Sequence, residues 1–326
     1  MAFGNHELWR IASRVTVGGR FQGHRQRIRQ TYWALPNLPR IWEGTVMCGL
    51  RRATIVCVRG SSRFEEFLSP LLNQAADFSD DARELVDELF PEDSIVGTMP
   101  GGTVYRLHIA ATATYRSGLL CLRAPETSVG TFSLLRGLLE AWSHLAFIAD
   151  STKGGDSRCR ALRYERGAMR EWADIVRNAP PSFDRDAWQQ QHHAKQLEVD
   201  ALWSKCRCSG SPRTYKHVTA TLNTLAGKPR MEWIPEVWKA TSATVHMYGV
   251  DYAFDSRGDG TSDLVWALPH HRATWLRFLA ATYAYLTVTT ATILCPDAAA
   301  IQEFHNAMGV LVANPELHRW ASGERR

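Results

Sequence analysis

Apolar residues recur at three- and four-residue spacing along most of the chain after residue 63, which is the period of an amphipathic α-helix. The pattern predicts helices over 64–76, 80–90, 103–121, 128–149, 156–178, 184–205, 215–225, 235–248, 270–294 and 297–312. There is no alternation of strand and helix patterns and no internal repeat. The predicted fold class is therefore all-α, a helical bundle.

Three segments refine this picture. Ser79 or Asp80 is a suitable N-cap, so a helix boundary is predicted there. The stretch 184–205 is polar on all sides, which predicts a solvent-facing helix. Residues 251–266 hold two short apolar runs around a Gly-containing turn, which predicts a short β-hairpin-like insertion.

The segment 278–294 is uncharged, and its length is at the short end for a membrane span. Trp275, Leu279 and Tyr283 begin a helical apolar stripe that continues through this segment. A buried core helix is therefore predicted, and no membrane contact.

The first 63 residues differ from the rest. They hold 11 Arg, no Lys and two acidic residues, a charge of +9, whereas the whole chain carries +5. No helical pattern is visible there, so a basic, poorly ordered arm is predicted over 1–63, followed by a single helical domain over 64–326. Such an arm binds nucleic acid or anionic lipid, or is a leader or over-extended gene start without a partner.

Composition is that of a globular protein, with 45% apolar and 22% charged residues. The seven cysteines are an odd, scattered set, and no signal peptide precedes them, which predicts reduced thiols and a cytoplasmic location. Cys206-x-Cys208 lacks a second cysteine pair, so neither a metal nor a cofactor is predicted. Phosphate-loop, nucleophile-elbow and H-E-x-x-H motifs are all missing from the sequence.

Three polar residues share one face of the predicted helix 128–149. Arg136, Glu140 and His144 follow one another at i, i+4 and i+8. The rest of this helix is apolar and aromatic, where a charged group is costly unless it is paired. The stripe is interpreted either as a structural chain of ion pairs or as part of a binding site.

A second stripe lies on the predicted helix 235–248, where Lys239, Ser242 and His246 fall at i, i+3 and i+7. A cation can hold a phosphate while an imidazole moves a proton, so these three are the candidate catalytic residues. The alternative is that His246 is a core histidine and that the polar residues lock the register of the helices.

The segment Leu135–Ile148, followed later by Trp238–Gly249, resembles an uncharacterised family of bacterial helical proteins. In that family an R-x-x-x-E helix precedes an S-x-x-x-H helix, which leads into a polar loop or hairpin and a closing hydrophobic helix. The resemblance covers roughly residues 64–295. It implies the helical fold but no assigned activity.

Lys239-x(6)-His246 is also similar, more distantly, to the R-x(4–6)-H signature of the HEPN superfamily. These helical domains are often metal-independent RNases of toxin–antitoxin and antiphage systems, and their Arg and His act together at a dimer interface. Here Lys239 stands in place of the arginine, and Ala240 in place of the polar residue after it.

Two functions therefore remain open. The first is a metal-independent endoribonuclease of a toxin or antiphage system, with RNA as partner and a homodimeric assembly. In it His246 is the general base, Lys239 stabilises the phosphorane and Ser242 orients the phosphate or the imidazole, while Arg136, Glu140 and His144 support them. The second is a non-catalytic module that senses a ligand or binds a partner.

Overall fold

The computed structural model describes most of the predicted helical domain and two short stretches of the N-terminal arm. The described residues are 43–48, 51–56, 62–89, 99–150, 156–180, 184–206, 218–228, 231–245, 254–256, 261–264, 268–295, 301 and 312–323.

Helices dominate the described residues, and the predicted all-α helical bundle is confirmed. The helices are α3 (Ser62–Leu89), α5 (Gly101–Arg123), the 3-10 turn η1 (Pro125–Thr127), α6 (Gly130–Ala149), α7 (Ser157–Arg177), α8 (Arg185–Ser204), α9 (Val218–Ala226), α10 (Ile234–Val245), α11 (Pro269–Leu294) and α13 (Pro315–Ala321). The pattern-based boundaries of α5 to α11 agree with these bounds to within a few residues.

In the described part of the chain, four short strands accompany the helices: β1 (Glu43–Cys48), β2 (Arg51–Val56), β3 (Phe254–Ser256) and β4 (Thr261–Leu264). They form one sheet in the order β1-β2-β4-β3. The pairs β1–β2 and β3–β4 are antiparallel, and β2 pairs with β4 in parallel. The rest of the predicted arm lies outside the described residues, so the division of the chain at residue 63 stays a prediction.

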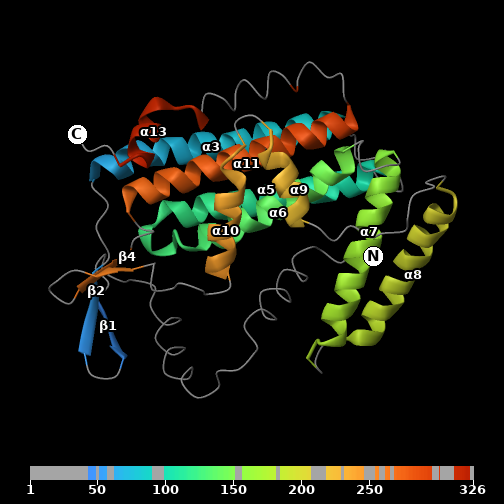
Figure 1. Ribbon diagram of the computed structural model, residues 1–326, viewed down its shortest axis with the longest axis horizontal. Helices are drawn as coiled ribbons and strands as arrows, with labels where there is room; N and C mark the ends of the chain where they lie inside the picture. Colours follow the sequence, from blue (N-terminus) through green and yellow to red (C-terminus); the bar gives the residue numbers. More distant parts are fainter. Residues whose placement is uncertain are drawn as a thin grey trace.

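The core lies between α3, α5, α6 and α11, which run side by side in the bundle (Figure 1). Buried residues occur on all sides of α11, because the helix is surrounded by the other three. The prediction that 278–294 belongs to a core helix is confirmed. None of the helices in the described part of the chain combines the length and the hydropathy that a membrane span requires.

The predicted boundary at Ser79 and Asp80 is wrong, because α3 continues through both residues. The Ser79 side chain is buried and accepts a hydrogen bond from Arg116 Nε of α5 at 2.8 Å. The same guanidinium pairs with the Asp80 carboxylate. Ser79 and Asp80 therefore bind Arg116 and connect α3 to α5. A local sequence pattern does not show such a contact between helices.

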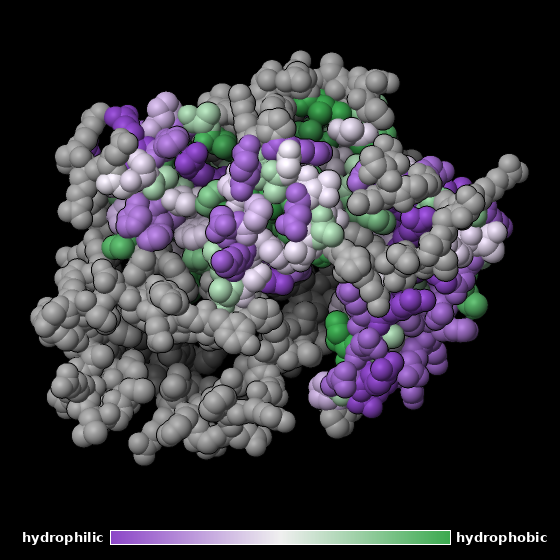
Figure 2. Space-filling model, in the orientation of Figure 1, coloured by the Kyte–Doolittle hydropathy of each residue, from purple (hydrophilic) through white to green (hydrophobic). Residues whose placement is uncertain are grey.

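Helices α7 and α8 form a hairpin beyond one end of the bundle (Figure 1). Asp156 caps α7 and Asp184 caps α8, each through a side-chain oxygen that accepts from a backbone N–H. Val199 is the one buried residue of α8, so its predicted solvent-facing character is confirmed. The hydrophilic surface of this hairpin is visible at the lower right of Figure 2.

A disulfide closes the base of the α7–α8 hairpin. It joins Cys159 in the first turn of α7 to Cys206 just after α8. The prediction that all cysteines are reduced is therefore wrong for this pair. The two residues are 47 apart in sequence, so the sequence did not show that they lie close together in the fold. Because disulfides persist in oxidising surroundings, the pair does not support the predicted reducing compartment. Cys206 is also no longer available as a metal-binding thiolate.

The C-terminal part departs from the sequence pattern. Most of the helix predicted over 297–312 lies outside the described residues. Helix α13, which the pattern did not predict, begins at the Asn314 cap and buries Leu317. The Trp320 ring packs edge-on against Phe64 of α3 at 4.9 Å, so this short helix covers one end of the core.

A buried arginine joins three of the four core helices. Arg272 of α11 is fully buried, and its guanidinium pairs with the Glu65 carboxylate of α3. Two of its nitrogens also donate to the Leu122 carbonyl, in the last turn of α5, at 3.2 and 2.6 Å. The Phe64 ring lies 5.4 Å from the guanidinium carbon. The cation is thus compensated by a carboxylate, a helix-end carbonyl and an aromatic ring.

We expect Glu65→Gln to lower the free energy of unfolding by about 2 to 3 kcal/mol, because it leaves the Arg272 cation buried without its counter-charge. Urea denaturation followed by circular dichroism measures the change. The control is Glu198→Gln, which removes the carboxylate of an exposed pair with Lys195. It should cost less than about 0.5 kcal/mol. Equal effects of the two variants would contradict the central role of Arg272.

Reduction of the Cys159–Cys206 bond should lower stability by up to about 4 kcal/mol on the chain-entropy estimate, since the two residues are 47 apart in sequence. Non-reducing peptide mapping should find the linked peptides, and denaturation with and without a dithiol reductant measures the loss. Cys121→Ser, at a free cysteine of α5, should leave the sensitivity to reductant unchanged. Alkylation of both Cys159 and Cys206 in unreduced, unfolded protein would refute the bond.

Candidate functional site

The polar stripe of α6 meets α10 at Arg136. Arg136 Nε donates to Glu140 Oε1 at 3.0 Å, one turn along the same helix. Its Nη1 donates to Ser242 Oγ on α10. The guanidinium carbon also lies 4.4 Å from the centre of the Trp238 ring, which is on α10 too. A carboxylate, a hydroxyl and an aromatic face therefore hold one cation between two helices.

Ser242 uses its hydroxyl in both directions. Its Oγ donates to the Trp238 carbonyl at 2.6 Å while it accepts from Arg136. A serine hydroxyl has a single proton, and here that proton is engaged with the backbone. Ser242 is thus placed to align α10 against α6.

The network is only partly shielded from water. The side chain of Arg136 is 20% exposed and that of Glu140 is 40% exposed. Because water screens an ion pair of this kind, its contribution to stability is modest, while its geometry still specifies how α6 and α10 face one another.

His144, the third member of the α6 stripe, faces another helix. Its ring lies 4.8 Å from the ring of Tyr164 on α7. Burial lowers the pKa of His144 to about 4, so the imidazole is neutral at neutral pH. Desolvation therefore disfavours a charge at His144, and the predicted extension of the ion-pair chain to this residue stays a prediction.

The second stripe is described only in part. Lys239 lies on α10 and is exposed, and Ser242 is half-buried. His246 lies outside the described residues, so its role as a general base stays a prediction. Of the six candidates, the structure brings Arg136, Glu140 and Ser242 into contact and places the His144 ring against Tyr164 of α7.

Trp238 is a further member of this network and lies outside both polar stripes. It lies four residues before Ser242 on α10, so the two side chains occupy one face of the helix. A tryptophan at that spacing from a polar residue, opposite a helix with a lone arginine, is a detectable signal for a cation–π contact.

Comparisons of the chain with protein-family models, curated proteins and solved structures give no match. Among the described residues, no group of three or more His, Cys, Asp or Glu is arranged to hold a metal ion. The functional interpretation therefore depends on the geometry of the chain itself.

A double-mutant cycle between Arg136→Met and Ser242→Ala should give a coupling free energy of about 1 kcal/mol, because the pair shares a charge-assisted hydrogen bond in a half-buried position. Urea denaturation of the four proteins measures it. The control cycle combines Arg136→Met with Ser117→Ala. The Ser117 hydroxyl also donates to a carbonyl one turn back, but it lies on α5. That cycle should give no coupling beyond about 0.3 kcal/mol. A coupling of the same size in both cycles would refute the contact.

Proposed function

We propose that the chain is a non-catalytic helical module that binds a ligand or a partner, and that the polar residues between α6 and α10 lock the register of the bundle. The observation that carries this proposal is the engagement of Arg136 by Glu140, Ser242 and Trp238 together. A guanidinium held from three sides acts as a structural tie, because its Nε and Nη1 both donate to groups of the protein and its face lies on an aromatic ring.

The Ser242 hydroxyl supports the same conclusion. A residue that orients a substrate phosphate must offer it a proton, and the Ser242 proton is donated to the Trp238 carbonyl. Its lone pair is in turn used by Arg136. Freeing Arg136 for catalysis would break its hydrogen bond to Ser242 between α6 and α10.

A second candidate function is the metal-independent RNase of a toxin or antiphage system. The observation that favours it is the exposure of Lys239, which leaves its ammonium accessible to a phosphate. In this proposal His246 takes the proton of the ribose 2′-hydroxyl and Lys239 stabilises the phosphorane, in a homodimer that binds RNA. The basic arm over 1–63 then contacts the RNA backbone, and the hairpin-like insertion near 251–266 follows the site.

Incubation of purified protein with RNA in the presence of EDTA separates the two functions. We expect no cleavage, a nearly silent Lys239→Ala variant, and a loss of about 1 to 3 kcal/mol of stability in His246→Ala, from a lost hydrogen bond and a partial cavity. Cleavage that disappears in both folded variants would instead establish the RNase and overturn the module. Because both variants are purified in the same way, they also control for contaminating nucleases.

A further inference from the structure

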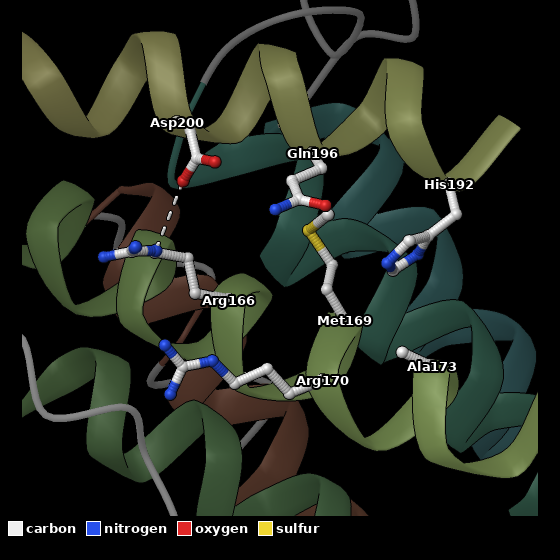
Figure 3. A pocket seen from close by; sticks show the side chains of 7 residues that line it. All are labelled: Arg166, Met169, Arg170, Ala173, His192, Gln196 and Asp200. Carbon is white, nitrogen blue, oxygen red and sulfur yellow. Dashed lines mark ion pairs between the residues drawn. The ribbon is translucent and has the colours of Figure 1, made fainter. Parts of the chain in front are cut away.

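A polar pocket lies between α7 and α8, outside the site described above. Its volume is about 240 Å³. Its lining residues are Arg166, Met169, Arg170 and Ala173 on α7 and His192, Gln196 and Asp200 on the neighbouring α8 (Figure 3). The Cys159–Cys206 disulfide joins the two helices at the base of the hairpin, so the walls of this pocket are covalently connected.

Two walls of the pocket are fixed by contacts within the hairpin. Arg166 Nε pairs with Asp200 Oδ1 at 3.4 Å, and its guanidinium carbon lies 5.0 Å from the centre of the Trp203 ring. The His192 ring stacks on Trp188 at 4.4 Å. These side chains are therefore held in place before any ligand arrives, which reduces the entropy cost of binding.

The pocket carries one positive charge more than its own carboxylate can balance. Arg166 and Arg170 are four residues apart, and like charges at that spacing repel one another. Asp200 compensates Arg166. Asp174, one turn beyond Arg170, pairs instead with Arg177. Within the described part of the chain, no carboxylate lies within ion-pair distance of Arg170, and its guanidinium lies on the same side of the pocket as that of Arg166 (Figure 3).

The rest of the lining limits the size and nature of a ligand. Met169 and Ala173 provide an apolar floor between the charged groups and His192. The volume equals that of roughly eight water molecules, which is below the size of a pocket for a drug-sized molecule. An occupant that suits both features has one anionic end and a short apolar body.

We propose that this pocket binds a small organic monoanion, a carboxylate on an apolar body, with the carboxylate on the Arg170 guanidinium. A planar guanidinium matches a carboxylate through two parallel hydrogen bonds. The His192 imidazole supplies a further polar contact, and the apolar body covers Met169. Asp200 favours a monoanion over a phosphate dianion, because the second negative charge would face this carboxylate. The proposal deepens the ligand-binding function proposed above, for which it names the ligand class.

Isothermal titration of the full-length, disulfide-bonded protein with benzoate and hexanoate tests the proposal. At least one of them should saturate with a dissociation constant in the millimolar range or tighter. Benzamide, which has nearly the shape of benzoate without its charge, should bind at least tenfold more weakly. Phenyl phosphate, a dianion at pH 7.5, should also bind more weakly than benzoate.

Arg170→Gln should weaken carboxylate binding at least tenfold. The matched control is Arg158→Gln, the same substitution on the same helix outside the pocket, which should leave binding unchanged. Both side chains are exposed, so the two variants should keep the helical circular dichroism spectrum of the parent.

Failure of both carboxylates to saturate would overturn the proposal, as would equal weakening by the two variants or tighter binding of phenyl phosphate than of benzoate. These results are independent of the RNA assay. RNA cleavage would remove the non-catalytic function while leaving carboxylate binding intact, whereas a failed titration would leave the RNA result unchanged.

Discussion

The bundle depends on the compensation of one buried cation. Arg272 can occupy the core only because Glu65 supplies a counter-charge and the Leu122 carbonyl accepts from two of its nitrogens. The last carbonyls of a helix lack partners within that helix and carry its negative dipole end. Arg272 therefore satisfies the end of α5 while it ties α3 to α11. Arg160 of α7 plays a similar part at the end of α6, where its Nε donates to the Ile148 carbonyl at 2.7 Å.

This use of arginine explains why an arginine-centred network need not be a catalytic site. Arg136 binds its neighbours across α6 and α10 in the way that Arg272 binds across α3, α5 and α11, although with more exposure to water. Arg170 differs from both, because the described residues offer its guanidinium no carboxylate. The two candidate sites therefore differ in their arginines. Arg136 is bound by groups of the fold, whereas Arg170 is available to a ligand.

Much of the helical fold could be predicted from the sequence, because apolar periodicity and local breakers determine where helices form. The contact between Arg136 and Ser242 could also be predicted from the sequence, since both are polar residues on otherwise apolar helix faces. The pocket was not, because the polar pattern of α8 gives no sign of which face meets α7. The roles of Ser79 and Cys206 likewise depend on partners distant in sequence, which a local pattern does not contain.

The position of α11 in the chain has a consequence for synthesis on the ribosome. This helix lies in the middle of the bundle but is the last long helix to emerge among those that the structure describes. Until it does, the apolar faces of α3, α5 and α6 have no complete core to close around, and such faces attract other chains or chaperones. Glu65 likewise has no Arg272 to pair with until some two hundred further residues have been translated. The nascent protein is thus most vulnerable to aggregation late in translation, just before its core is completed.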